Sequence, residues 1–138
     1  MLHIDGTART QVPAGPARCL EVLAAAEDYP KWSSLLAEVE RTGDGELALR
    51  ATVLGLSVHM RCTLEIGPDR AVMRRVPHGP DDDERYEATW TVTPDGAGSV
   101  VALHTVADLA APGPASLLRG RVTRALVDDL LADFVRAV

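Results

Sequence analysis

The stretch AAEDYPKW, residues 25–32, places two aromatic residues around a proline where an alanine-rich helical pattern ends. In residues 17–26, ARCLEVLAAA, apolar side chains recur at helical spacing. Pro30 disfavours the helical conformation at Tyr29 and suits the first turn of a new helix. The stretch therefore predicts a junction between two short helices.

On either side of this junction the dominant pattern is the alternation of a half-buried β-strand. It is strictest in residues 56–66, LSVHMRCTLEI, where Val58, Met60, Cys62 and Leu64 point one way and Arg61 the other. Gly55 supplies a turn before this segment. Six segments are predicted as strands: residues 2–12, 45–54, 56–66, 71–76, 85–93 and 100–109.

The C-terminal residues 112–138 are predicted to form one long helix opened by Pro112 and Pro114. Its apolar side chains recur at about helical period and form one broad stripe. The stripe comprises Leu118, Val122, Leu126, Leu130 and Phe134, and the opposite face carries Arg119, Arg121, Arg124, Asp128, Asp129 and Asp133.

The order of elements is strand, two short helices, a run of antiparallel strands and a long helix. Such a sheet has one apolar face, and its only long apolar partner is the last helix. Burying one against the other predicts an α+β fold with a curved antiparallel sheet of about six to seven strands wrapped around a C-terminal helix. We expect residues 1–138 to form a single domain.

Composition excludes several classes of protein. The net charge of −6 argues against a nucleic-acid-binding face, and the acidic run at residues 81–84 is predicted to be a solvated loop tip. Cys19 and Cys62 are too few for a zinc site or a disulfide framework and are expected to be small buried residues. No cofactor or metal is expected. No segment has the length of a membrane span, so we expect a cytoplasmic protein without membrane insertion, either a monomer or a homodimer.

The order of elements, the segment VPAGPARCLEVLAAAEDYPKW at residues 12–32 and the amphipathic last helix resemble the START/Bet v 1-like (SRPBCC) superfamily. Within it, they resemble the bacterial polyketide cyclase/dehydrase and lipid-transport group. The most specific piece is Asp28, Tyr29, Pro30 and Trp32, which is close to a recurrent motif of that group. The resemblance covers essentially the whole chain and implies a helix-grip fold.

The resemblance also implies a cavity between the sheet and the last helix that binds an apolar small molecule, such as a lipid, a polyketide or an isoprenoid. Strand alternation and the helix stripe predict its lining as Leu49, Val53, Val58, Met60, Cys62, Met73, Tyr86, Trp90, Leu103, Leu118 and Val122. Trp32 is either a large core residue or a lid over the cavity mouth, with Asp28 capping or anchoring the turn.

Members of this group that act as aromatase/cyclases place a proton donor and an inward arginine beside a poly-β-ketone. Candidates here are Tyr86 and Arg74, although Arg74 and Arg75 are adjacent, so alternation sends one of them inward or to the sheet edge. His104 is predicted to face solvent, and His78 belongs to a loop that could border the entrance.

Two functions follow as hypotheses. The first is binding or carriage of a hydrophobic small molecule without catalysis, and the second is a polyketide cyclase or dehydratase that uses no metal. A third, in which the sheet binds a macromolecular partner, would be favoured by an exposed apolar patch.

Overall fold

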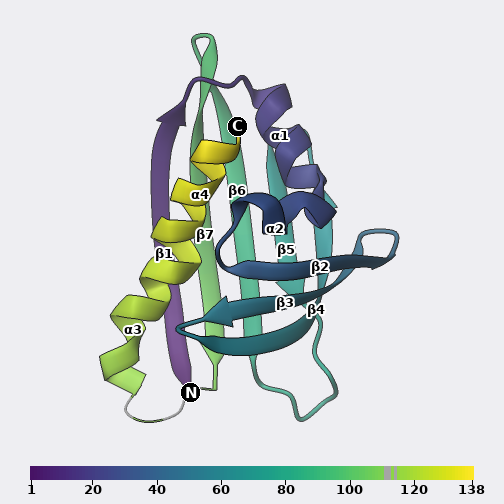
Figure 1. Cartoon of the computed structure of the whole chain (residues 1–138), viewed down its shortest axis with the longest axis vertical. Helices are drawn as coiled ribbons and strands as arrows, with labels where there is room; N and C mark the ends of the chain where they lie inside the picture. Colours follow the sequence, from purple (N-terminus) through teal and green to yellow (C-terminus); the bar gives the residue numbers. More distant parts are fainter. Residues whose placement is uncertain (111–112, 114) are drawn as a thin grey trace.

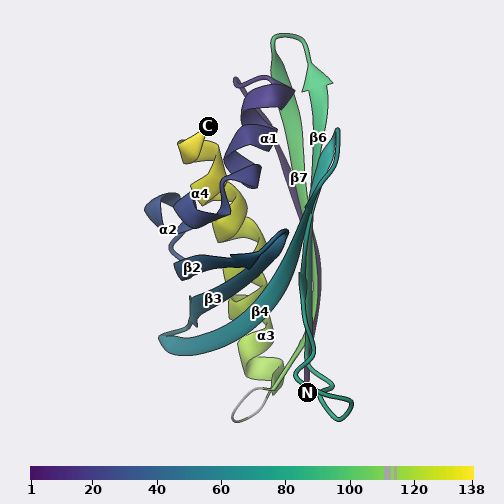
Figure 2. The same ribbon diagram turned by 90° about the vertical axis from the view of Figure 1, so that its right-hand side faces the viewer.

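The computed structural model describes residues 1–110, 113 and 115–138. A seven-stranded antiparallel sheet curves around the C-terminal helix, and two short helices follow the first strand (Figures 1 and 2). The predicted α+β architecture is therefore confirmed. The predicted helix opening at Pro112 and Pro114 lies outside the described residues.

The strands follow the order β1-β7-β6-β5-β4-β3-β2 across the sheet, so β1 and β2 form its edges. Strands β1, β6 and β7 run along the molecule, whereas β2, β3 and β4 curl across it, below the two short helices in the view of Figure 1. The bounds are β1 Leu2–Val12, β2 Leu36–Gly43, β3 Glu46–Val53, β4 Leu56–Ile66, β5 Arg70–Arg75, β6 Arg85–Asp95 and β7 Gly98–Leu109. Strand β2 was not among the six predicted segments.

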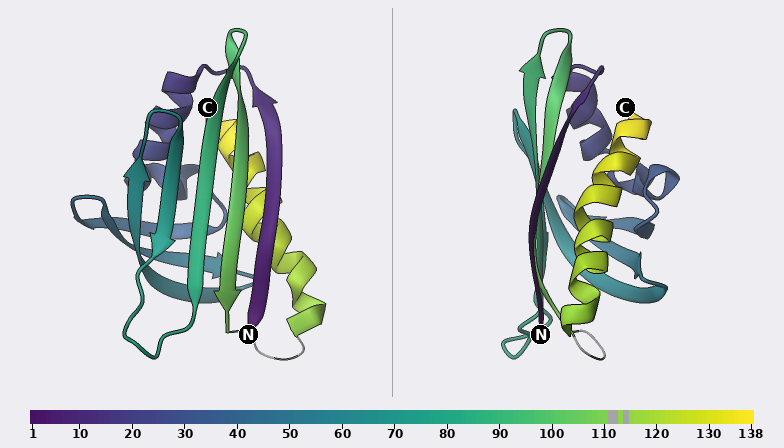
Figure 3. Two further views of the ribbon diagram at one scale, coloured as in Figure 1. Left: turned by 180° about the vertical axis from the view of Figure 1, so that it is seen from behind. Right: turned by 90° about the vertical axis from the view of Figure 1, so that its left-hand side faces the viewer.

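Alternation assigns the two faces of the sheet as the sequence predicted. On β7, Val101 and Leu103 are fully buried on the inner face. His104, which follows Leu103 in the chain, points outward, and its Nε2 lies 2.7 Å from Asp5 Oδ1 on β1. The outer face, seen from behind in Figure 3, carries no helix, so its side chains meet solvent directly.

The helix junction forms where the sequence predicted it. Helix α1, Pro16–Ala24, ends before a 3-10 turn, η1, Ala26–Asp28, and α2 then spans Tyr29–Trp32. The Tyr29 hydroxyl donates a hydrogen bond to the Leu23 carbonyl at the end of α1. Tyr29 thereby satisfies a carbonyl that the broken helix leaves without an intrahelical partner.

The C-terminal helix is not uniformly α-helical. It comprises α3 Ala115–Thr123, a π-helical segment η2 Arg124–Asp129, and α4 Leu130–Ala137. Its predicted stripe is confirmed, because Val122, Leu126, Leu130 and Phe134 are all buried. In the π segment, the Leu126 carbonyl accepts a hydrogen bond of 3.2 Å from Thr105 Oγ1 on β7, which ties the helix to the sheet.

Gly6 allows this helix to lie close to β1. A Cβ atom at residue 6 would lie 3.0 Å from Thr123 Cγ2 and 3.1 Å from Val127 Cγ2. These contacts are tighter than ordinary van der Waals contacts, so a larger residue at this position would push the helix away from the strand.

Asp133 corrects the predicted polar face of the helix. Its side chain is buried, with Oδ2 accepting hydrogen bonds from the Ser34 amide and the Ser34 hydroxyl, both at 2.9 Å. Arg136 pairs with the other carboxylate oxygen. Asp133 thus anchors the segment between α2 and β2 to α4, and its carboxylate is buried because these partners replace water.

A cluster of four aromatic rings joins the junction, the helix and the sheet. Phe134 on α4 is fully buried, and its ring centroid lies 5.7 Å from Trp32 and 4.9 Å from Trp90 on β6. Trp32 in turn contacts Tyr29 edge to face at 5.3 Å. These rings connect α2, α4 and the centre of the sheet.

Replacing Phe134 with Ala is therefore expected to lower the free energy of unfolding by about 3–5 kcal/mol, because it leaves a void between two tryptophans. Urea denaturation monitored by tryptophan fluorescence measures this loss. The control is Ile66→Ala at a side chain that is 43% exposed, where the change should stay within about 0.5 kcal/mol. Equal losses in both variants would contradict the central role of Phe134.

Candidate functional site: an apolar cavity between sheet and helix

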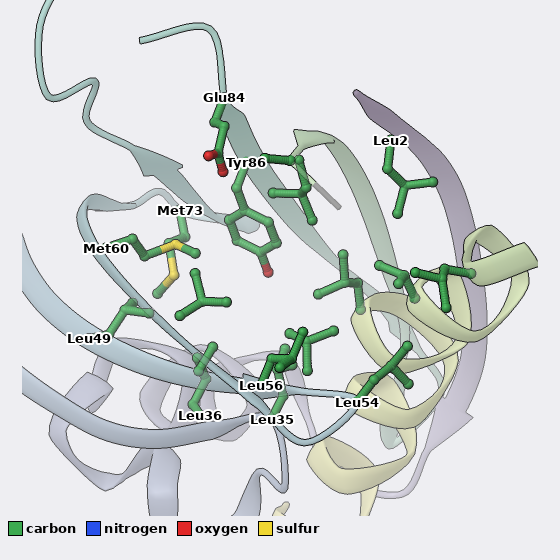
Figure 4. Close-up of a pocket in the computed structure, with 18 residues that line it drawn as sticks. Leu2, Leu35, Leu36, Leu49, Leu54, Leu56, Met60, Met73, Glu84 and Tyr86 are labelled. Carbon is green, nitrogen blue, oxygen red and sulfur yellow. The ribbon is translucent and has the colours of Figure 1, made fainter. Parts of the chain in front are cut away.

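A cavity of about 110 Å³ lies between the concave face of the sheet and the first half of the C-terminal helix (Figure 4). One water molecule needs roughly 10–15 Å³ by this measure, so the space exceeds a single buried water. Of the eighteen lining residues, only Glu84 and Tyr86 have polar side chains. The cavity is therefore suited to an apolar molecule with few polar groups.

Eight of the twelve residues predicted at the site line this cavity. They come from strands β3 to β6 and from α3: Leu49, Val53, Val58, Met60, Met73, Tyr86, Leu118 and Val122. The other four, Cys62, Trp90, Leu103 and Trp32, are not among the lining residues. Cys62 is a free thiol within the packed core, where burial raises its pKa to about 12, and Leu103 is completely buried.

Trp32 does not close the cavity mouth. Its ring packs between Tyr29 and Phe134, and it borders a shallow surface hollow with Lys31 and Ala137. Its indole Nε1 is buried without a hydrogen-bond partner among the described residues. Trp32 is therefore half-buried against the core and does not line the cavity.

Asp28 does not cap the turn either. Its side chain makes no capping hydrogen bond and instead pairs with Lys31 at 3.0 Å on the surface. The junction is held by the Tyr29 hydroxyl and by packing of its aromatic rings. The capping role predicted for Asp28 is therefore wrong, and its pair with Lys31 is its contact within the turn.

Among the described lining residues, Tyr86 provides the one hydroxyl. The residue lies on the inner face of β6, and its ring points into the space between the methionines and the leucines that line the cavity (Figure 4). The described structure contains no hydrogen bond from this hydroxyl to another protein group. Burial, with smaller contributions from Cys62 and Tyr29, raises the Tyr86 pKa, so the phenol stays protonated and able to donate.

The two adjacent arginines of β5 take different positions, and neither lines the cavity. Arg74 lies on the outer face, where it pairs with Glu87 at 3.1 Å and Glu65 at 3.3 Å. The candidate role of Arg74 in the cavity is therefore wrong. Arg75 is the enclosed one: its side chain is 7% exposed and lies 2.7 Å from Asp82 Oδ2, and it also donates to the Glu84 carbonyl at 2.8 Å.

The acidic run at residues 81–84 is not simply a solvated tip. Asp82 accepts hydrogen bonds from Arg75 and from the backbone amides of His78 and Glu84. These bonds hold the pKa of the Asp82 carboxyl well below its usual range. Asp82 thus organises the β5–β6 loop that leads to Glu84 and Tyr86, while His78 is exposed and does not line the cavity.

Ten lining residues were missing from the predicted set. Ala51 and Leu126 belong to faces that the patterns had already assigned to the core, whereas the remainder lie at strand ends, in turns or on β2. These ten are Leu2, Leu35, Leu36, Ala51, Leu54, Leu56, Glu84, Leu109, Ala110 and Leu126. Leu54 and Leu56 flank the Gly55 turn. Their location beside a turn is the sequence feature that could have indicated that they border an opening.

In the part of the chain that the structure describes, no helix is both long and apolar enough to cross a membrane. The same residues contain no group of three or more His, Cys, Asp or Glu side chains placed to hold a metal ion.

Comparison with known proteins identifies the family. Residues 3–138 match the model of the polyketide cyclase/dehydrase and lipid transport family, and the chain belongs to that family. A search of curated proteins found no match.

Solved structures with the same fold include a START superfamily protein from Mycobacterium smegmatis, which is 14% identical with a TM-score of 0.78 and covers 97% of this chain and 96% of its own. The Zhui aromatase/cyclase from Streptomyces sp. R1128 is 17% identical with a TM-score of 0.75, and the match covers 98% of this chain and 90% of that one. A STAR-related lipid transfer protein from Xanthomonas axonopodis is 19% identical with a TM-score of 0.70, and the match covers 96% of this chain and 84% of that one. At these identities the likeness shows the fold alone.

The Asp82 network predicts a specific acid sensitivity. Because the folded-state pKa is depressed, the carboxylate contributes stability above the unfolded pKa of about 4, and this contribution is lost as the pH falls below that value. Asp82→Asn should therefore destabilise the protein at pH 7, and the difference from the original protein should shrink towards pH 2. Thermal melts across this range measure the effect.

The matched control is Asp83→Asn, since Asp83 is exposed and makes no side-chain hydrogen bond in the described structure. It should leave the melting temperature nearly unchanged at every pH. A pH-independent effect of Asp82→Asn would contradict the ionic origin of its contribution.

Proposed function

We propose that this protein binds and carries a hydrophobic small molecule in the cavity between the sheet and the C-terminal helix. The observation that carries the proposal is the cavity lining, which is apolar except for Glu84 and the inward Tyr86 hydroxyl. An apolar wall with one or two orienting polar groups is the usual form of a small-molecule site.

The lining can also adapt to ligands of different shapes. Met60 and Met73 lie side by side on one wall (Figure 4), and their flexible thioethers repack at low cost. The Tyr86 hydroxyl fits a ligand that ends in a carbonyl or hydroxyl group, since a protonated phenol in an apolar setting donates a strong hydrogen bond. A lipid, a polyketide and an isoprenoid all meet this description.

The second candidate is a polyketide cyclase or dehydratase, and the inward Tyr86 hydroxyl is the observation that favours it. Such chemistry needs a proton donor near a developing enolate or alkoxide. However, no arginine lines the described cavity, and the charge of Arg75 is balanced by Asp82. Carriage is therefore the function with more support.

Tyr86→Phe separates the two functions. Under carriage, the variant binds the ligand with a modest loss of affinity, equal to one hydrogen bond. Under catalysis, the variant binds a poly-β-ketone analogue normally and loses turnover, which is measured by the appearance of cyclised product.

Native mass spectrometry of the protein purified from its own host tests the main proposal directly. A stoichiometric apolar compound should accompany the folded protein and be released on denaturation. A protein that is empty, and that gains no thermal stability from panels of lipids and polyketides, would overturn both ligand-binding functions.

A cavity-filling variant gives the matched test in vitro. Ala51 is buried in the cavity wall on β3, and Ala48 lies on the opposite face of the same strand. Ala51→Leu should weaken binding of an apolar fluorescent probe, such as N-phenyl-1-naphthylamine, roughly tenfold because it occupies the space of the ligand. Ala48→Leu should leave the affinity unchanged, and equal effects of the two variants would contradict binding in this cavity.

A further inference from the structure

Three exposed leucines lie on the two elements that border one end of the cavity, the β3–β4 connection and α3. Leu54 in the β3–β4 turn and Leu56 at the start of β4 are 46% and 56% exposed and also line the cavity. Leu117 on α3 is 75% exposed and precedes Leu118, which lines the cavity. The β3–β4 turn and α3 lie at the same end of the molecule (Figures 1 and 2). We call Leu54, Leu56 and Leu117 the mouth patch.

The β3–β4 turn retains a leucine where backbone geometry disfavours one. Leu54 has φ of 51° and Gly55 has φ of 81°, and Leu54 is the only non-glycine residue in the described structure with positive φ. A two-residue turn with both φ values positive strongly prefers Asn, Asp or Gly. A strained position that presents a large apolar side chain to solvent is better explained by a binding role of that side chain than by stability.

A basic helix lies beside this patch. Residues 109–127 contain Arg119, Arg121 and Arg124 and no acidic residue, in a chain whose net charge is −6. The three arginines are exposed and form no ion pair with any described residue. The acidic β5–β6 loop leaves the same end of the molecule on the side away from the β3–β4 turn (Figure 2). An anionic surface would therefore attract the α3 side and repel the loop, which fixes one orientation.

We propose that the mouth patch docks on an anionic lipid bilayer, with the leucines entering the interfacial region and the arginines contacting lipid phosphates. A surface that combines exposed apolar side chains with adjacent basic residues binds such membranes in their interfacial plane. This is peripheral docking and needs no membrane-spanning helix. The cavity would then open directly onto lipid, so that an apolar ligand passes between bilayer and protein without crossing water.

This last step rests on the proposed ligand-binding function, whereas docking itself does not. The two are measured separately. Docking is measured by co-sedimentation of the ligand-free protein with vesicles, and ligand binding by probe fluorescence in the absence of vesicles.

The test compares vesicles of phosphatidylcholine alone with vesicles of phosphatidylcholine and phosphatidylglycerol at low salt. The protein should sediment with the anionic vesicles and be released by salt. Leu54→Asn should weaken binding roughly tenfold by removing an inserted side chain. Because Asn tolerates positive φ, the same variant should melt at an equal or higher temperature, so lost binding cannot be ascribed to unfolding.

Matched controls separate the patch from general surface properties. Ile66→Asn removes a comparably exposed residue at the opposite end of β4 and should leave vesicle binding unchanged. Arg119→Gln with Arg121→Gln should weaken binding about fivefold per charge. Arg9→Gln with Arg61→Gln, at exposed arginines on the outer face of the sheet that form no ion pair with described residues, should have much smaller effects.

Failure of the protein to bind anionic vesicles would overturn docking, as would equal binding by the protein and Leu54→Asn. A dimer that Leu54→Asn converts to a monomer, without vesicle binding, would also overturn it and assign the patch to a second copy of the chain. An acidic protein that binds the patch while vesicles do not would overturn it in the same way. Vesicle binding without probe binding would support docking and overturn ligand exchange through the mouth.

Discussion

The contact of Phe134 with Trp32 and Trp90 is the constraint on which the rest of the structure depends. It holds the second half of the C-terminal helix against the middle of the sheet and fixes the helix junction above them. The chain has only five aromatic residues, and four of them belong to this cluster. The fifth, Tyr86, lines the cavity. The aromatic volume of the protein is thus concentrated where the helix must be fixed, and the space beyond it is left to smaller aliphatic side chains.

One helix therefore has two functions along its length. Leu130 and Phe134 on α4 complete a packed core, whereas Leu118 and Val122 on α3 form a wall of the cavity. The π-helical segment lies between these two parts. Side chains spaced strictly four apart drift around an ordinary α-helix of 3.6 residues per turn, and the wider π turn compensates for this drift. The stripe consequently faces the sheet from end to end.

Much of this architecture follows from local patterns in the sequence. Strand alternation correctly assigned the inner face at positions such as Val58 and Met60, and helical spacing identified the stripe that ends at Phe134. These predictions succeeded because burial on one face leaves a periodic signal. Strand β2 left none, since as an edge strand it is largely exposed and its register with β3 shifts at two places.

The polar residues were harder to place, because their positions depend on partners far away in the sequence. Helical spacing places Asp133 on the polar face of the helix, yet Ser34 makes its burial possible. Asp82 lies within a run of acids that sequence alone cannot distinguish, and only the approach of Arg75 gives it a defined role. Likewise, alternation left open which of Arg74 and Arg75 turns inward. The apolar half of the site could thus be predicted from the sequence, and the polar half required the tertiary structure.

The pairing of β1 with β7 has a consequence for the growing chain on the ribosome. Leu2 pairs with Leu109 and Val12 with Ser99, so the first strand has no partner until nearly the whole sheet has been synthesised. The helix that covers the inner face emerges later still. Pairing between segments so distant in sequence slows folding, because a long loop must close before any contact compensates for it. In the nascent protein β1 therefore stays unpaired until β7 has emerged, and closure of this part of the sheet is a late step in folding.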